Sequence, residues 1–150
     1  MIKILFICHG NICRSCMAEF ICKEMLRQAG LEKKITVSSA AVSREEIGND
    51  MYPPAKDMLR QKHIPFERRA ARQVTETEME SYDLILAMDH SNLRWLSRMF
   101  GDRYAAKTRL LMSYTSRQGD VSDPWYTDDF LTCYEDISEG CRELLKTLDS

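Results

Sequence analysis

Apolar residues along this chain follow two alternating patterns. Short, β-rich apolar runs occupy residues 2–8, 35–40, 82–88 and 108–112, and each run predicts a strand. The first run is almost continuously apolar, which is typical of a strand covered on both faces of its sheet. Because helical patterns separate the runs, we expect right-handed crossovers and a parallel sheet enclosed by two layers of helices.

Capping residues and apolar repeats predict where the helices begin and end. The first helix is expected to start with Ser15 as its cap and to stop at Gly30, with apolar residues on one face between them. A second helix has Pro53 and Pro54 in its first turn and runs towards His63.

Three more helices are predicted in the second half of the chain. Thr75 and Glu78 form the sequence pattern of a capping box for a short helix. Another helix opens at Ser91 and ends at Gly101. From Asp128 onwards, apolar side chains recur on one helical face, so a closing helix is expected to pack on the sheet. That face consists of Phe130, Tyr134, Ile137, Cys141, Leu144 and Leu148.

These elements predict a single α/β domain over residues 1–150, built as a three-layer α/β/α sandwich with a central four-stranded parallel sheet. A chain of 150 residues, 44% of them hydrophobic, is long enough to bury its own core. Ligands of such sheets bind beyond the carboxyl ends of the strands. The loop after the first strand, residues 8–15, is therefore the expected site.

Charge and hydropathy narrow the range of partners. The net charge is -2, from 21 basic and 23 acidic residues, which excludes the pervasive positive field of a nucleic-acid-binding protein. No apolar run approaches the roughly 20 residues that span a bilayer, and the amino-terminal residues lack the pattern of a signal peptide. We therefore expect no nucleic acid, no membrane and a cytoplasmic location.

The six cysteines are clustered along the chain, and their spacing matches neither a disulfide framework nor a common zinc site. The sequence also lacks the glycine-rich motifs of ATP-binding and NAD-binding loops. We therefore expect a reducing compartment, no metal and no cofactor. Cys133 and Cys141 fall on the closing helix and are expected to pack in the core.

Residues 8–15 combine a nucleophile with an anion-binding loop. A thiol, Cys8, ends the first strand, and Arg14 follows directly before the helix. Backbone N–H groups of a tight loop and a helix N-terminus bind anions together, and Gly10 and Asn11 tolerate the positive φ that such a loop needs. The planar fork of Arg14 suits a tetrahedral oxyanion during phosphoryl transfer. We expect phosphate to be bound by His9, Gly10, Asn11, Ile12, Cys13, Arg14 and Ser15.

Attack of a thiolate on phosphorus requires a proton donor for the departing oxygen. Asp123 follows the fourth strand, so it is expected at the same edge of the sheet as Cys8. Pro124 stiffens its loop, and Trp125 and Tyr126 are expected to form the wall of a pocket for a phenyl ring. Taken alone, Asp-Pro is the sequence of a plain turn, and the presence of Cys8 favours the catalytic interpretation.

Together these residues resemble the low-molecular-weight protein tyrosine phosphatase family. Its motif is Cys-x-Gly-Asn-x-Cys-Arg-Ser near the amino terminus, with Asp-Pro and aromatic residues near the carboxyl terminus, and both parts match this sequence. Further similarity falls at residues 38–40, 71–73, 88–93 and 129–130. The resemblance therefore covers nearly the whole chain.

The resemblance implies hydrolysis of phosphotyrosine and aryl phosphates through a phosphocysteine on Cys8. It implies that Arg14 binds phosphate and that Asp123 acts first as acid and then as base. A tyrosine-phosphorylated protein is the implied substrate, and inorganic phosphate and vanadate are the implied inhibitors. Cys13 is implied to pair reversibly with Cys8 under peroxide, with simple packing as the alternative. Cys16 stands where the family usually has Pro and adds a third thiol near the loop, which is the alternative candidate for this redox role.

The rim of the substrate pocket departs from the family pattern. Trp125 and Tyr126 keep an aromatic wall, and Tyr52 is expected to contribute from the other side. Glu45 falls where many family members carry an aromatic residue. An acidic rim is expected to disfavour acidic phosphopeptides, and the alternative is that these charges only face water. The acidic residues are Glu45, Glu46 and Asp50.

The sequence leaves two other functions open. An arsenate reductase on the same fold also resembles this chain, but it requires further redox cysteines, and none occurs between Cys22 and Cys133. The second is a catalytically silent phosphate-binding or redox-sensing module, against which the intact Cys8, Arg14 and Asp123 argue.

Two basic features near this loop have both a functional and a purely structural interpretation. His9 is expected at the mouth of the pocket, with a merely exposed histidine as the alternative. Arg68, Arg69 and Arg72 form a basic spot opposite several glutamates. Surface salt bridges explain this spot, and one arginine is also placed to support the loop.

Overall fold

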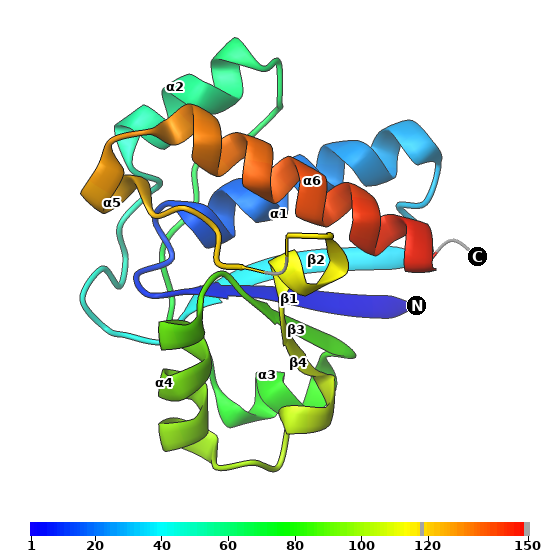
Figure 1. Ribbon diagram of the computed structural model, residues 1–150, viewed down its shortest axis with the longest axis vertical. Helices are drawn as coiled ribbons and strands as arrows, with labels where there is room; N and C mark the ends of the chain where they lie inside the picture. The colour runs from blue at the N-terminus through cyan, green and yellow to red at the C-terminus, as the bar shows by residue number, and fades with distance from the viewer. Residues whose placement is uncertain (118, 149–150) are drawn as a thin grey trace.

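The computed structural model describes residues 1–117 and 119–148 (Figure 1). At its centre is a four-stranded sheet in the order β2-β1-β3-β4, in which every neighbouring pair is parallel. The α/β class and the central four-stranded parallel sheet are thereby confirmed. The strands are β1 (Ile2–Cys8), β2 (Ile35–Ala41), β3 (Leu84–Ala87) and β4 (Thr108–Leu110).

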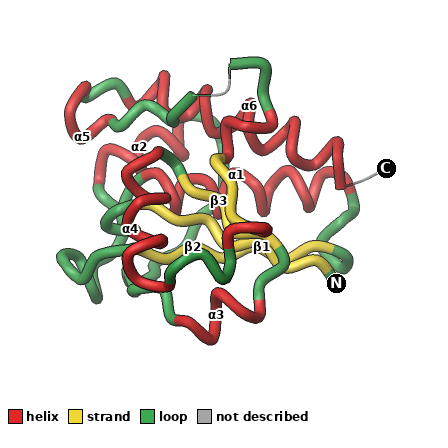
Figure 2. Tube along the Cα trace, turned by 60° about the horizontal axis from the view of Figure 1, so that its bottom comes forward, coloured by secondary structure: helices red, strands yellow, loops and turns green. Residues whose placement is uncertain are grey.

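Helices cover both faces of this sheet, which gives the three layers (Figure 1). On one face α1 (Arg14–Ala29) lies beside α6 (Phe130–Leu148), and α2 (Pro53–Gln61) packs against both. The opposite face carries α3 (Glu76–Ser81) and α4 (His90–Phe100). Figure 2 shows the strands enclosed between these two sets of helices. In the described part of the chain, no helix combines the length and apolar character needed to cross a membrane.

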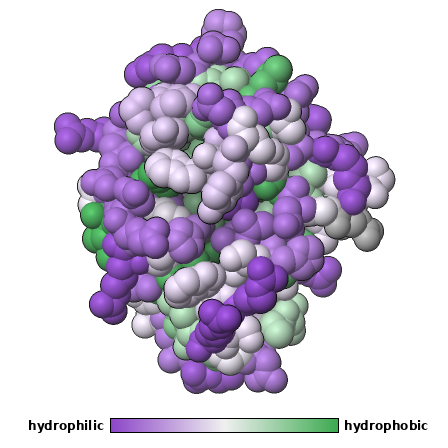
Figure 3. Space-filling view, turned by 60° about the vertical axis from the view of Figure 1, so that its left-hand side comes forward, coloured by the Kyte–Doolittle hydropathy of each residue, from purple (hydrophilic) through white to green (hydrophobic). Residues whose placement is uncertain are grey.

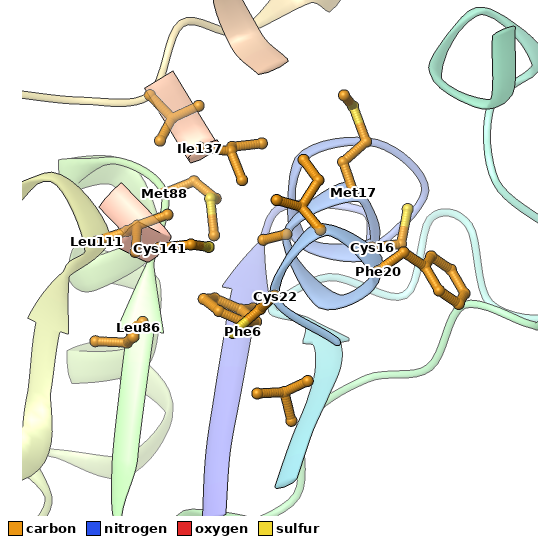
Figure 4. Close-up of a cluster of buried hydrophobic side chains, with 14 of the residues drawn as sticks. Phe6, Cys16, Met17, Phe20, Cys22, Leu86, Met88, Leu111, Ile137 and Cys141 are labelled. Atoms are coloured by element: carbon orange, nitrogen blue, oxygen red, sulfur yellow. The ribbon is translucent and has the colours of Figure 1, made fainter. Parts of the chain in front are cut away.

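The central strand β1 supplies side chains to two hydrophobic cores. Ile4 and Phe6 belong to the core beneath α1 and α6, and Leu5 and Ile7 belong to the core on the other face. All four are fully buried, as the continuous apolar run predicts. Each buried side chain of this size stabilises the fold by about 1.5–3 kcal/mol. Figure 4 shows part of the larger core, where it labels Phe6, Cys22, Leu86, Met88, Leu111, Ile137 and Cys141.

Several predicted helix ends are confirmed. Gly30 ends α1 in the left-handed conformation at φ 71°, and Gly101 follows α4 at φ 71°. Pro53 stands at the start of α2. At the start of α3, Thr75 and Glu78 form both hydrogen bonds of the capping box.

Other predicted boundaries are wrong, and each has a local cause. Ser15 does not cap α1, which already begins at Arg14, because the Ser15 hydroxyl is used inside the preceding loop. The helix expected to open at Ser91 begins at His90, since the Asp89 carboxylate accepts the Asn92 N–H at 2.8 Å and caps it.

The third and fourth strands are shorter than predicted. Tyr82 still belongs to the end of α3, because its N–H donates to the Glu78 carbonyl, so β3 begins only at Leu84. The chain leaves β4 after Leu110 and enters a 3₁₀ turn over Leu111–Tyr114. Short apolar runs at strand ends do not reveal where the backbone stops pairing.

The closing helix begins later than predicted because an unpredicted single-turn helix precedes it. This helix, α5 (Pro124–Thr127), ends at Asp128, which has a left-handed backbone at φ 60°. The backbone therefore cannot continue directly into a helix, and α6 starts at Phe130. Cys133 and Cys141 on α6 are fully buried, which confirms their packing role.

Candidate active site

Three loops at the carboxyl edge of the sheet bring the site together. Cys8 is the last residue of β1, Asp89 follows β3, and Asp123 follows β4 and opens α5. The strand order places β1 between β2 and β3, where the crossover connections leave in opposite directions. A crevice at such a switch point is the usual ligand site of an open α/β sheet.

The thiol of Cys8 forms the floor of the site and is only 4% exposed. The Asn11 N–H donates to its Sγ at 3.3 Å, and the Ser15 Oγ lies 3.0 Å from the same atom. Asn11 Nδ2 donates to Ser15 Oγ at 2.8 Å, which leaves the serine proton free to point at the sulfur. The sulfur therefore has two polar neighbours that are placed to donate to it.

The loop around this thiol is held by the buried side chain of Asn11, whose backbone has a positive φ of 60°. Its Nδ2 also donates to Ser39 Oγ at 3.0 Å. Its Oδ1 accepts the backbone N–H of Arg72 at 3.3 Å and a guanidinium N–H of Arg69. Asn11 and Ser15 thus lie behind the loop rather than in its cavity, and Arg69 is the arginine that supports it.

Arg14 lies beside the thiol with its guanidinium buried. Its Nη2 is 2.9 Å from Asp89 Oδ2 and 3.3 Å from Asp123 Oδ2, and its Nη1 donates to the Val121 carbonyl at 3.2 Å. Burial lowers the pKa of Arg14, but nearby negative charges, first that of Cys8, outweigh it and raise the pKa above its usual value. The Arg14 guanidinium is therefore fixed in orientation, and its positive charge lies beside the Cys8 thiol.

Asp89 is the functional neighbour that the sequence analysis missed. Its signal was present, because Asp89 ends an apolar run and precedes a helix at the same sheet edge as Cys8. Aspartate is a common cap at the start of a helix, so this sequence pattern alone does not indicate a role in the site. Only the distance to Arg14 shows it.

The carboxylate of Asp123 is the side chain expected to exchange a proton with the substrate. Its Oδ1 accepts the Trp125 N–H at 3.0 Å as the cap of α5, and its Oδ2 points to Arg14. The side chain is 30% exposed, so it is accessible from the cleft. The structure therefore brings Asp123 to Cys8 and Arg14, as the sequence predicts.

These groups open into a cavity of about 500 Å³. Trp125 and Tyr126 line it with 60% and 85% exposure, and Glu45 and His9 lie at the rim, where His9 was expected. Figure 3 shows the molecule from the left-hand side of Figure 1, where α5 lies, with pale side chains of intermediate hydropathy in the middle and hydrophilic ones around them. The expectation that Tyr52 forms the opposite wall is wrong. Its ring packs against Trp125, with centroids 5.2 Å apart, and supports that wall from outside the cavity.

Of the two other acidic residues expected at the rim, one lines the cavity and the other does not. Glu46 lines the cavity with Glu45. Asp50 does not, because its carboxylate binds Lys56 Nζ and the Arg69 N–H. A cavity of about 550 Å³ also lies between α1 and residues 65–67, but its lining contains no cysteine or histidine.

The three thiols of this region have different environments. A hydrogen bond with the Cys133 thiol, together with burial, raises the pKa of Cys13 well above its usual value, and Cys13 still lines the cavity. Cys16 is fully buried in the core, where its thiol donates to the Cys13 carbonyl at 3.1 Å. Burial raises the pKa of Cys16 as well. Of these two neighbours, only Cys13 shares the cavity with Cys8.

Comparison with known proteins gives matches along the whole chain. The family model for low molecular weight phosphotyrosine protein phosphatase matches residues 3–150. The low molecular weight protein-tyrosine-phosphatase YfkJ of Bacillus subtilis is 39% identical over 150 residues, which cover 99% of this chain and 96% of YfkJ. The human low molecular weight phosphotyrosine protein phosphatase is 36% identical over 149 residues, covering 96% and 94% of the two chains.

Solved structures agree with these sequence matches. The crystal structure of YfkJ has a TM-score of 0.95 at 38% identity and covers 99% of this chain and 95% of its own. YwlE of Bacillus subtilis, described as an arginine phosphatase, has a TM-score of 0.88 at 35% identity, covering 99% and 97%.

Proposed function

The chain belongs to the low molecular weight phosphotyrosine protein phosphatase family, and from this premise we propose that it hydrolyses phosphotyrosine through a phosphocysteine on Cys8. The observation that carries this proposal is the environment of the Cys8 sulfur. It lies at the floor of an open cavity, accepts the Asn11 N–H, lies 3.0 Å from Ser15 Oγ, and has Arg14 beside it. A sulfur nucleophile next to a fixed guanidinium suits attack on a phosphate ester.

In the first step the Cys8 sulfur bonds to phosphorus while the ester P–O bond breaks. Arg14 holds two phosphate oxygens, and the bound dianion takes the place of Asp123 as its partner. Asp123, which lines the same cavity, gives its proton to the departing tyrosine oxygen.

In the second step Asp123, now a carboxylate, accepts a proton from water as the water oxygen bonds to phosphorus. The P–S bond breaks, inorganic phosphate forms, and Cys8 leaves as a thiolate that Ser15 and Asn11 stabilise again. Inorganic phosphate and vanadate bind the same loop and therefore inhibit the enzyme.

The cavity walls support tyrosine as the residue that carries the phosphate. Trp125 and Tyr126 offer aromatic surface to a phenyl ring, while the thiol lies at the floor with 4% exposure. A phosphoserine is too short to place its phosphorus at that depth. Phosphoarginine is the rival substrate, because YwlE, an arginine phosphatase, shares this fold, and the peptide comparison described below separates the two substrates.

The environments of the other cysteines do not support an arsenate reductase. Such an enzyme passes a disulfide from the nucleophile to further thiols, whereas Cys16, Cys22, Cys133 and Cys141 are all fully buried. We also propose that Cys13 is the redox partner of Cys8. Peroxide converts the Cys8 thiolate to a sulfenic acid, which condenses with the Cys13 thiol to a disulfide and water.

The test is phosphate release from matched peptides that carry phosphotyrosine, phosphoserine or phosphoarginine, measured with a thiol reductant present. Selective release from the phosphotyrosyl peptide supports the proposal, and selective release from phosphoarginine replaces the substrate while keeping the mechanism. Cys8→Ser is expected to abolish release but to keep vanadate binding. Cys22→Ala removes a buried thiol elsewhere and is the matched control. Turnover by Cys8→Ser would refute the covalent mechanism.

A further inference from the structure

An exposed tryptophan of α4, Trp95, lines the cavity, and α4 lies well apart from α5 in the fold (Figure 1). Trp95 is 36% exposed, whereas Asn92 and Leu96 form the buried side of the helix. The Trp95 ring meets the His9 ring edge-on, with centroids 5.9 Å apart and an interplanar angle of 67°. This indole lines the cavity while remaining partly open to solvent, so its ring is accessible to a ligand.

Two glutamates of the loop after β2 line the same cavity. Glu45 Oε2 lies 3.1 Å from His9 Nε2, and its side chain is 70% exposed. Glu46 accepts a hydrogen bond from Asn49 Nδ2 at 2.6 Å. Across residues 1–117 and 119–148, neither glutamate forms an ion pair with a lysine or an arginine. Their negative charge is therefore available at the rim.

The other carboxylates of the cavity already have a cationic partner. Asp89 and Asp123 both contact the guanidinium of Arg14. Arg94, the exposed neighbour of Trp95 on α4, does not line the cavity. The cavity thus has the Arg14 guanidinium and its two carboxylates at its centre and an acidic, aromatic margin on the side of Glu45 and Trp95.

A flexible cation is the ligand chemistry that fits this margin. The face of a tryptophan attracts an ammonium or guanidinium group, and a nearby carboxylate adds a charge-assisted hydrogen bond. We propose that Trp95, Glu45 and Glu46 form a subsite for an arginine or lysine that flanks the phosphotyrosine of the substrate. This inference rests on the proposed phosphotyrosine hydrolysis and adds the sequence context that the enzyme prefers.

The experiment compares kcat/KM for three phosphotyrosyl peptides whose flanking residues are arginine, alanine or glutamate. One exposed cation–π contact and one exposed ion pair are each worth about threefold, so arginine is expected to exceed alanine by about tenfold. Trp95→Ala and Glu45→Gln should each reduce that ratio by about threefold. Trp95→Phe keeps an aromatic ring and should restore part of it. The ratio should also fall at about 0.5 M salt, because the ion pair is screened.

Glu67→Gln is the matched control, since it removes the same charge at an exposed position outside this cavity and should leave the ratio unchanged. An arginine-to-alanine ratio near one in the wild-type enzyme overturns the subsite, and so does a ratio that Trp95→Ala and Glu45→Gln leave unaltered. p-Nitrophenyl phosphate has no flanking residue. If the enzyme hydrolyses this compound but shows no preference among the peptides, only the proposed subsite is refuted. If it hydrolyses none of the substrates, the proposed function is refuted as well.

Discussion

Replacing Asn11 by glycine and by alanine separates the two ways in which this residue holds the phosphate-binding loop. Its side chain connects four groups of three other segments, and its backbone has a φ of 60°. Asn11→Gly removes the side chain but tolerates the backbone conformation. Asn11→Ala removes the same hydrogen bonds and adds the strain of a Cβ at positive φ.

The structure gives the expected size of both effects. Without Asn11, the partly buried N–H of Arg72 and a guanidinium N–H of Arg69 lose their acceptor, and Ser15 and Ser39 lose a donor. Each buried polar group that loses its partner destabilises the fold by about 1–3 kcal/mol, and by less where water replaces the partner. We expect Asn11→Gly to lower the free energy of unfolding by about 3 kcal/mol. For Asn11→Ala the left-handed backbone adds about 1–2 kcal/mol.

Equilibrium unfolding in urea measures these differences. Ser39→Ala, which removes one of the four contacts of Asn11 and the hydrogen bond from Ser39 Oγ to Glu19, is the comparison and should cost about 1–2 kcal/mol. Equal stability of the glycine and alanine variants would show that the backbone is not strained. A loss below about 1 kcal/mol in both would refute the role of the network.

Three further changes have expected outcomes. Asp123→Asn should slow hydrolysis of phosphotyrosine by about 10²–10³-fold, but hydrolysis of aryl phosphates with acidic phenols much less; equal slowing would remove Asp123 from the acid role. Gly140→Ala should cost about 1–3 kcal/mol in thermal unfolding, since its Cβ would lie 2.6 Å from Leu111 Cγ. Burial opposes ionisation of Asp50, but hydrogen bonds, first that from Lys56, outweigh it and lower its pKa to about 2. The stabilisation by the Asp50 carboxylate is therefore fully present above its usual pKa of 3.8 and is lost as the pH falls towards 2. In Asp50→Asn, the free energy of unfolding measured in urea should therefore depend less on pH over that range.

The loop after β1 could be predicted because its functional residues lie within one short stretch of sequence. Cys8 and Arg14 are separated by one tight loop, and a strand and a helix on either side fix their geometry. The same local information misassigned Ser15, since a serine before an apolar repeat looks like a cap. Its hydroxyl is instead held by Asn11 at 2.8 Å, a contact that exists only once the loop has closed around the thiol.

The rim of the cavity could not be predicted in the same way. Glu45 and Tyr52 were both assigned to the pocket by their place in the sequence, yet only Glu45 lines it. Trp95 gave no signal, because one exposed aromatic residue on an amphipathic helix is ordinary. Its position beside His9 depends on how α4 packs beneath the sheet.

Sequence alone is sufficient to predict the alternation of strands and helices, the helix ends marked by proline and glycine, and the loop that joins Cys8 to Arg14. These features depend on interactions among residues only a few positions apart. Long-range packing places two carboxylates at Arg14, brings Arg69 to Asn11 behind the loop, and places Trp95 at the cleft. Such contacts join segments that lie far apart along the chain, and only the order and packing of the strands bring them within hydrogen-bonding distance.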